Sequence, residues 1–398
     1  MTFRARRIGV LLAAGAVSLW SAESIDWDEY LSRQKRQIFD LQEQSNLLES
    51  TLLKRSWVNP LTLSYSVNTS ESFGKETTTR SYSVSIDQPI FKSGGIYYAV
   101  KYAQAQEGAN SLQIRRQRRG MIVQTLTTLF SLRKNRLQQR QARLRLRNDA
   151  IDIRRKQEQY DAGVIDSSFL NQAILQRNRD QTTLLGLQLA EKSLRSQFAQ
   201  LSDKDPDRLT PPKLRLIDAE TYRRNHLELQ EKRLRVIQSD YNAKMTRSKY
   251  LPTLSLNANI THTDSDAAYP IDPHTYRYGF RLSMPLNINA PVDMEASRVR
   301  YLRQSVELED DRKRVESDYR LILDNIKILE KKIALARSDA RLYASLLKST
   351  KEQAQAGQKT SADVETMRNA KAISELDERI YAIDRQIELL KLYAASHP

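Results

Sequence analysis

Residues that could perform catalysis are few in this sequence. The 398 residues include no cysteine and four histidines, His226, His262, His274 and His397. The histidines do not show the spacing of a metal site, and a chain without cysteine has neither thiolate ligands nor a cysteine nucleophile. No Ser-His-Asp arrangement, phosphate-binding loop or paired-carboxylate site stands out. The sequence therefore predicts a protein that is not an enzyme, with no metal and no cofactor.

Polar residues with a definite physical role gather in two short runs. YDAGVIDSSFL covers residues 160–170 and AQAGQKTSADV covers residues 354–364, each inside a long helical pattern. A glycine with positive φ ends a helix, and a serine, threonine or aspartate caps the helix that returns. We expect a tight turn between two helices at each run. The candidate residues of these turns are Gly163, Asp166, Ser167, Gly357, Thr360 and Ser361.

Composition and charge narrow the class of protein. Glycine and proline number only 11 each and 28% of residues are charged, which predicts long helices. The net charge of +16 arises largely in helical stretches such as residues 133–147. Such a charge can indicate nucleic acid, but no aromatic-rich basic motif or recognition helix accompanies it. The solvated face of a coiled coil is the favoured interpretation, and we expect no nucleic-acid partner.

Residues 1–22 have the pattern of a signal peptide, with three early arginines, an apolar stretch at 8–20 and small residues after it. Ser18 and Ala22 are both possible ends of the peptide. No later segment approaches the roughly 18 apolar residues that a membrane helix needs. We therefore expect an exported protein without a helical membrane anchor.

Two repeats are predicted in the rest of the chain. Equivalent landmarks are offset by 192 residues for Pro60 and Pro252, by 196 for Pro89 and Pro285, and by 194 for the two turn glycines. The first repeat, residues 23–202, would hold an N-terminal helix, a strand hairpin at 57–91 and a helical hairpin at 94–201 with its tip near 163. Residues 203–213 would form a connector. The second repeat, 214–398, would hold a helix, a strand hairpin at 250–287 and a helical hairpin at 291–395 with its tip near 357.

The strand-like stretches alternate between apolar and polar residues. PLTLSYSVN, SYSVSID, PTLSLNANIT and TYRYGFRLSM all show this pattern, which suits a membrane strand with lipid on one face and water on the other. The face of a soluble β-sandwich is the alternative. Asp87, Arg277 and Arg281 fall on the polar side, the expected barrel lumen. Candidates for an aromatic girdle at the membrane interfaces are Trp57, Tyr65, Tyr82, Tyr276, Tyr278 and Phe280.

Both strands and helices predict association of several chains. Four strands cannot close a membrane barrel, because known barrels begin at about eight strands. In the helices, apolar positions from Val315 onward are spaced alternately four and three apart, as in a coiled coil. A second line, Leu321, Ile328, Leu335 and Leu342, recurs every seven residues beside the first. A helix with two such lines has neighbours on both sides.

The order of these motifs resembles the TolC-type outer-membrane efflux family. DQPIFKSGGIYYAVKYAQAQEGA and MPLNINAPVDMEASRVRYLRQ are similar to its transitions from strand to helix, and the two Ala-Gly runs resemble the turns at the far tips of its helices. The resemblance covers the chain from about Asp26 onward. It implies an α+β membrane protein: a homotrimer whose shared outer-membrane β-barrel, four strands per chain, continues into a long antiparallel coiled-coil barrel in the periplasm.

The resemblance also implies partners and a gate. The partners would be a periplasmic adaptor protein, an inner-membrane pump and outer-membrane lipid, in tripartite efflux or type I secretion. The tip residues named above would contact the adaptor. Other residues at the tips would hold the tunnel closed, and the matching positions are Ser168, Lys359 and Asp363. Capping and packing of the hairpin alone is the alternative for Lys359 and Asp363. Two positions depart from the family pattern, because Phe169 and Thr366 stand where acidic residues occur in some members.

Two other classes of protein remain as alternatives. A periplasmic adaptor has one coiled-coil hairpin between paired β-rich halves, whereas this sequence predicts two hairpins and four membrane-type strands. A basic coiled-coil scaffold that binds nucleic acid would explain the charge, but the signal peptide and the alternating strands count against it.

Overall fold

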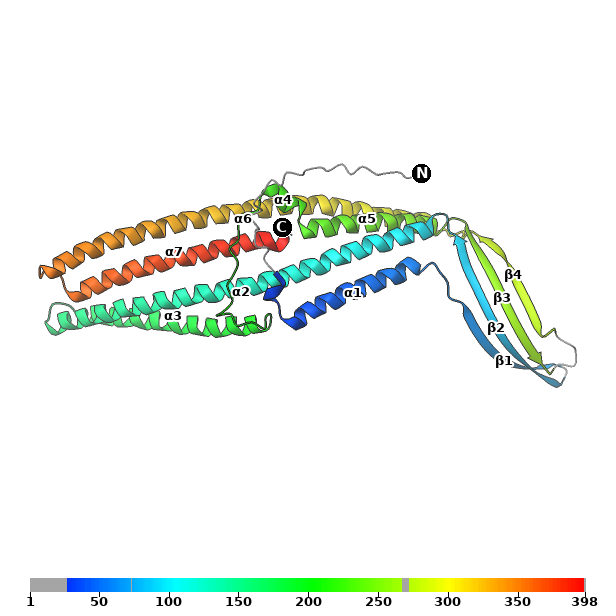
Figure 1. Ribbon diagram of the computed structural model, residues 1–398, viewed down its shortest axis with the longest axis horizontal. Helices are drawn as coiled ribbons and strands as arrows, with labels where there is room; N and C mark the ends of the chain where they lie inside the picture. Colours follow the sequence, from blue (N-terminus) through cyan, green and yellow to red (C-terminus); the bar gives the residue numbers. More distant parts are fainter. Residues whose placement is uncertain (1–26, 73, 267–271, 397–398) are drawn as a thin grey trace, which may run out of the picture.

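The computed structural model describes residues 27–72, 74–266 and 272–396. Its long helices form an elongated body, and a four-stranded sheet extends from one end at an angle (Figure 1). The predicted signal peptide lies outside the described residues. Among those that are described, no helix combines the length and the apolar character needed to cross a membrane.

The order of elements is the same in the two halves of the chain, except for the short leading helices. The first half contains the 3-10 helix η1 (Trp27–Tyr30), α1 (Arg33–Arg55), β1 (Thr62–Ser72), β2 (Lys75–Phe91), α2 (Gly95–Asp161) and α3 (Ser167–Ala199). The second half contains α4 (Ala219–Arg224), α5 (Leu227–Ser248), β3 (Thr253–Ser265), β4 (His274–Ser283), α6 (Ala290–Gln355) and α7 (Ser361–Ala395).

Two long helices run through the whole helical body. The 67 residues of α2 and the 66 residues of α6 correspond to about 100 Å each at roughly 1.5 Å per residue. Near the sheet, α1 and α5 lie beside them, in the order α1, α2, α5, α6; towards the far end the order is α3, α2, α7, α6 (Figure 1). The body is thus a layer four helices wide, with α6 at one edge and α1 and α3 at the other.

The two apolar lines of α6 have different environments. Val315, Tyr319, Ile322 and Ile326, on the first line, are all buried. Leu321, Ile328, Leu335 and Leu342, on the second line, are between 53% and 63% exposed. One face of α6 is therefore packed within the chain, and the other forms an apolar edge of the helical layer.

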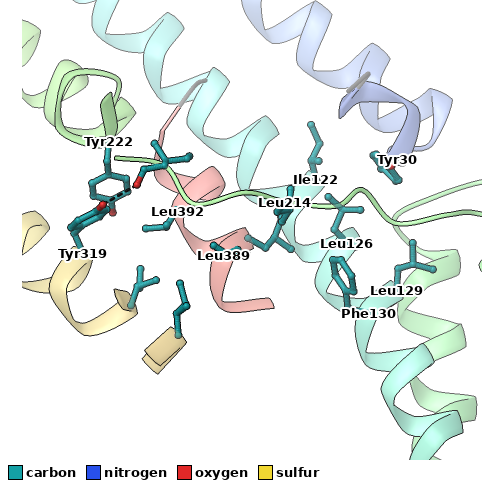
Figure 2. Close-up of a cluster of buried hydrophobic side chains, with 14 of the residues drawn as sticks. Tyr30, Ile122, Leu126, Leu129, Phe130, Leu214, Tyr222, Tyr319, Leu389 and Leu392 are labelled. Atoms are coloured by element: carbon teal, nitrogen blue, oxygen red, sulfur yellow. Dashed lines mark hydrogen bonds between the residues drawn. The ribbon is translucent and has the colours of Figure 1, made fainter. Parts of the chain in front are cut away.

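A compact core lies midway along the body, where the ends of several helices meet (Figure 2). Leu126 and Leu129 of α2 and Leu389 and Leu392 of α7 are fully buried there. The segment between α3 and α4 joins this core through Leu214 and Ile217. The Tyr319 hydroxyl donates to the Ile217 carbonyl at 2.8 Å, which fixes this segment to α6. The core thus joins the two halves at mid-length.

The sheet is antiparallel and has the order β1-β2-β3-β4. Its central pairing, β2 with β3, joins strands from different halves of the chain, with Val84 opposite Ile260. Tyr276 of β4 lies opposite Ile260 in turn. Since side chains alternate between faces, this register gathers serine, threonine and asparagine on one face and Leu, Ile, Val and aromatic residues on the other.

The pH dependence of stability should reveal that the charged carboxylate of Asp149 destabilises the helical body. Burial, with Asp180 next in importance, raises the pKa of Asp149 in α2 to about 6. Its Oδ2 atom is buried and has no hydrogen-bond partner among the described residues. Between about pH 4, the ordinary aspartate range, and pH 6 the folded chain holds this proton more tightly than the unfolded chain. Stability therefore falls as the pH rises through that window.

We expect Asp149→Asn to raise the Tm at pH 8 and to leave it nearly unchanged at about pH 3, where the wild-type carboxyl is largely neutral in both states. Circular dichroism melts in detergent at both pH values measure this. Asp324→Asn is the control, because Asp324 is exposed and forms only a surface pair with Lys327. Equal Tm shifts for the two variants at pH 8 would contradict the expected destabilisation by the charged Asp149.

Candidate functional site

The two helical tips at the far end of the body have the same backbone structure. In the first, Gly163 has φ +71°, its N–H donates to the Tyr160 carbonyl, and the Val164 N–H donates to the Gln159 carbonyl at 2.8 Å. In the second, Gly357 has φ +76°, and the N–H groups of Gly357 and Gln358 repeat these bonds. Each is a Schellman turn, which satisfies the last carbonyls of the incoming helix.

The first tip is capped by Asp166. Its carboxylate accepts the Ser168 N–H at 2.8 Å, and this bond to the backbone holds the pKa of Asp166 below its usual value. Ser167 begins α3, and both serines are exposed. Val164 and Phe169 beside them are 71% and 50% exposed. The first tip therefore presents an apolar surface beside the carboxylate of Asp166 that caps α3.

The second tip is capped by Thr360. The Asp363 N–H donates to Thr360 Oγ1 at 3.2 Å, and Asp363 Oδ2 accepts the Thr360 N–H at 3.0 Å, a reciprocal capping box. Thr360, and to a smaller extent Arg155, lowers the pKa of Asp363. Lys359 and Ser361 are exposed on the turn. The tip carboxylate therefore stays charged, and it pairs with α2, because Arg155 Nη2 lies 2.7 Å from Asp363 Oδ1.

The Arg155–Asp363 contact is the last in a series of polar contacts between α2 and α7. The four contacts join a side chain of α2 to one of α7 at 2.7 or 2.8 Å: Lys134–Asp384, Gln141–Asp377, Asn148–Asn369 and Arg155–Asp363. We call this series the polar seam. It follows the boundary between the two helical hairpins, from mid-length to the tip. Neighbouring hairpins are thus joined there by hydrogen bonds and ion pairs.

The polar seam was not predicted, although the sequence contains a signal for it. Lys134, Gln141, Asn148 and Arg155 recur every seven residues in α2, and this period places them on one face of a coiled-coil helix. The charged stretch at residues 133–147, which contains Lys134 and Gln141, predicts instead the solvated face of a coiled coil. Only the position of α7 beside α2 shows that these side chains meet partners.

The polar face of the sheet contains the residues expected to line a lumen. Arg281 Nη1 lies 3.3 Å from Asp87 Oδ2 across the sheet. Arg277 is also exposed on this face. A groove lies between them, lined also by Asn59, Asn257 and Asn259. One carboxylate and two guanidinium groups therefore leave this groove with a net positive charge.

The opposite face of the sheet is apolar and exposed. Leu63 is 74% exposed and Tyr278 is 87% exposed, and Tyr276 and Phe280 lie on the same strand as Tyr278. The rings of Tyr65 and Tyr82 lie 4.8 Å apart on neighbouring strands. Of the six residues expected to form a girdle, Trp57 lies between α1 and β1, outside the strands, and the other five lie on this face.

Solved structures of other proteins resemble this chain, although its sequence identity to them is low. No protein-family model and no curated protein matches the sequence. Among solved structures, the Campylobacter jejuni outer-membrane channel CmeC matches with a TM-score of 0.75 at 13% identity, over 93% of this chain and 84% of that one. The outer-membrane protein VceC of Vibrio cholerae matches with a TM-score of 0.71 at 15% identity, over 93% and 95%. The Neisseria gonorrhoeae MtrE channel, described in its open state, matches with a TM-score of 0.66 at 12% identity, over 93% and 87%.

The chain has the TolC-type channel fold. Since the likeness covers 93% of this chain, it extends over both the helices and the sheet.

The histidines of this TolC-type chain have two different environments. His226 is a buried cap whose Nδ1 accepts the Leu229 N–H at 3.4 Å, and burial lowers its pKa. His262 and His274 lie opposite each other on β3 and β4, whereas His397 lies outside the described residues. No group of three or more His, Cys, Asp or Glu side chains in the described ranges is placed to hold a metal ion.

The tip glycines should be essential for local stability. A Cβ at Gly163 or Gly357 would meet nothing within 4 Å, so the cost of Gly163→Ala or Gly357→Ala lies in the backbone alone. We expect about 1–2 kcal/mol for each, because an L-residue disfavours this left-handed conformation. Hydrogen exchange of the tip amides should quicken correspondingly.

Gly186→Ala is the matched control. Gly186 lies inside α3 and is equally uncrowded, so alanine should slow local exchange by the equivalent of roughly 0.5–1 kcal/mol. If all three substitutions change exchange in the same direction, the assigned role of the tip glycines is wrong.

Proposed function

We propose that this chain is one subunit of an outer-membrane exit duct, with its sheet in the membrane and its helices extending into the periplasm. The observation that carries this proposal is the sheet, which has one polar face and one exposed apolar face and connects directly to helices about 100 Å long. A soluble protein rarely exposes so continuous an apolar face. Lipid against the apolar face and water against the polar face would match the chemistry of both faces of the sheet.

The edges of the sheet support association of several copies. Within the described residues, β1 and β4 each pair on one side only. Unpaired backbone groups are very costly in lipid, so a membrane sheet must close on itself. Pairing β4 of one copy with β1 of the next would close it, and three copies would give a barrel of twelve strands. We propose this homotrimer, which agrees with the TolC-type fold.

The edges of the helical layer support the same assembly. The exposed line of α6 contains Leu335, which is 63% exposed. At the opposite edge, Leu52 of α1 and Leu185 and Leu189 of α3 are 71%, 55% and 70% exposed. In a ring of identical copies, each α6 edge would pack against the α1 and α3 edge of its neighbour. Burial of both apolar edges would then provide a large part of the association energy.

The direction of the helices supports a role in a tripartite efflux pump or in type I secretion. With the sheet in the outer membrane, the tips would point towards the inner membrane. There, Val164 and Phe169 would offer apolar contacts to a periplasmic adaptor protein attached to an inner-membrane pump. The net positive groove at Asp87, Arg277 and Arg281 would favour anionic cargo. A periplasmic adaptor with one hairpin is disfavoured, because this chain contains two helical hairpins.

The polar seam would be the part of the tunnel that opens. Side-chain hydrogen bonds contribute only about 0.5–1.5 kcal/mol each, since water can replace them. An apolar seam, in contrast, loses its burial energy when it separates. The hairpin α2–α3 could therefore move away from α6–α7 along the polar seam at a small cost. The Arg155–Asp363 pair would hold the tip closed, and Ser168 and Lys359 would lie beside the opening.

Substitution at the α6 edge tests the assembly. We expect Leu335→Asp to abolish the trimer, because a charge would be buried between copies. Unheated outer-membrane extract on a denaturing gel would then show monomer in place of a heat-modifiable trimer band. Ala334 directly precedes Leu335 and lies roughly 100° away around the helix. Ala334→Asp therefore adds the same charge away from the exposed line and should leave the trimer intact. A trimer band that survives Leu335→Asp would exclude this interface.

Single-channel recording in planar bilayers tests the gate. We expect Arg155→Ala to raise the ratio of open to closed channel by up to about fivefold per chain, the equivalent of a surface ion pair of up to about 1 kcal/mol.

The matched control is Arg337→Ala, which removes an ion pair of 2.6 Å to Glu378. That pair joins α6 to α7 within one hairpin, so its loss should leave the ratio unchanged. Equal effects of the two substitutions would show that the polar seam has no special part in opening.

A further inference from the structure

One row of ring side chains crosses the apolar face of the sheet, with one residue from each strand. The strand register pairs Tyr65 with Tyr82, Tyr82 with His262, and His262 with His274. From one strand to the next, the ring centres are 4.8, 6.2 and 4.7 Å apart. Arg80 and Asp264 lie opposite each other two residues beyond the row, towards the connecting loops. The two histidines therefore lie where the apolar face ends and charged residues begin.

Backbone pairing brings the two histidine side chains as close as two strands allow. The Thr263 N–H donates to the Pro273 carbonyl at 2.8 Å, so these two residues form a hydrogen-bonded pair. The adjacent pair, His262 and His274, is then of the non-hydrogen-bonded kind, in which facing side chains approach most closely. Their Nδ1 atoms are 3.4 Å apart.

A carboxylate lies beside one of these rings. Asp264 Oδ1 lies 3.3 Å from Nε2 of His262, so this carboxylate favours the tautomer with its proton on Nε2. The Nδ1 atom of His262 is then the acceptor of the hydrogen bond from Nδ1 of His274, and a metal ion would take the place of that proton once His274 carries its proton on Nε2. Histidines that bind metals in proteins generally have such a partner on the nitrogen that faces away from the metal.

We propose that His262 and His274 together bind a divalent first-row metal ion, with Zn²⁺ as the best fit, through their Nδ1 atoms. Imidazole is a preferred ligand of Zn²⁺, and two nitrogens about 2.0–2.1 Å from one tetrahedral ion lie about 3.3–3.4 Å apart. The observed separation of 3.4 Å matches this distance. Water would occupy the remaining positions of the ion.

Such an ion would stabilise the β3–β4 edge of the sheet. It would connect β3 to the edge strand β4 next to the loop that joins them, and an ion that binds only the folded hairpin stabilises it. All three residues belong to one hairpin of one chain, so the site needs neither a second copy nor a membrane.

The site was not apparent in the sequence, for a physical reason. His262 and His274 are 12 residues apart, which is not a metal-binding spacing within one helix or one tight turn. Only the register of β3 with β4 places them opposite each other.

Calorimetric titration of the full chain with Zn²⁺ tests the proposal. The chain is purified in detergent without a polyhistidine tag and stripped with a chelator. We expect one ion per chain, loss of this binding in His274→Gln, and affinity weaker by about tenfold or more in Asp264→Asn, which lacks the carboxylate beside Nε2 of His262. Tyr82→Phe is the control in the same row and should bind as the wild type does. Equal Zn²⁺ affinity in the wild type and His274→Gln would overturn the proposal.

Electron paramagnetic resonance with Cu²⁺ gives a second measurement that does not depend on a variant. Cu²⁺ binds imidazole still more strongly than Zn²⁺ does, and its spectrum counts the nitrogen ligands. We expect two imidazole nitrogens for the wild-type chain at one ion per chain. A spectrum with one nitrogen or none would reject the site even if His274→Gln did not fold.

Discussion

The backbone pairing of β2 with β3 is the constraint on which the other features of the structure depend. It joins the two halves of the chain, with Val84 opposite Ile260, and so places the helical hairpin that follows β2 beside the one that follows β4. A shift of one residue would turn every side chain of a strand to the other face. The same register gathers the charged groove on one face and the row of rings on the other.

The boundaries between helices differ in chemistry, and this difference matters for how the body could move. The first apolar line of α6 is buried within the chain, and the core at mid-length is fully closed around Leu126, Leu389 and Leu392. The polar seam, in contrast, extends from mid-length to the tips through single hydrogen bonds and ion pairs. The body therefore combines a firmly packed middle with a far end whose two hairpins are weakly joined. Such a combination supports the opening along the polar seam that we propose above.

The apolar edges of the chain indicate what the single chain leaves incomplete. Both edges of the sheet have unpaired backbone groups within the described residues, and both edges of the helical layer expose leucines. These edges occur on opposite sides of the molecule, so association between copies would be head-to-tail, which gives a ring when the rotation between copies closes. The homotrimer proposed above would use all of them.

Much of the fold could be predicted from the sequence, because it depends on local periodicity. Alternation in PTLSLNANIT predicted a strand, the Ala-Gly runs predicted the two tips, and the heptads after Val315 predicted two apolar lines on α6. Of these lines, the single chain buries one. Each of these signals lies within one segment, where residue spacing alone decides which side chains share a face.

Contacts between segments far apart in the chain could be known only from the tertiary structure. Arg155 meets Asp363 across 208 residues, and no pattern in either helix names its partner. His262 and His274 gave no metal-binding spacing, yet strand register brings their Nδ1 atoms to 3.4 Å. By itself, then, the sequence determined the elements and their faces, since these follow from local geometry. The tertiary structure decided which faces meet, because that depends on the register and packing of the whole chain.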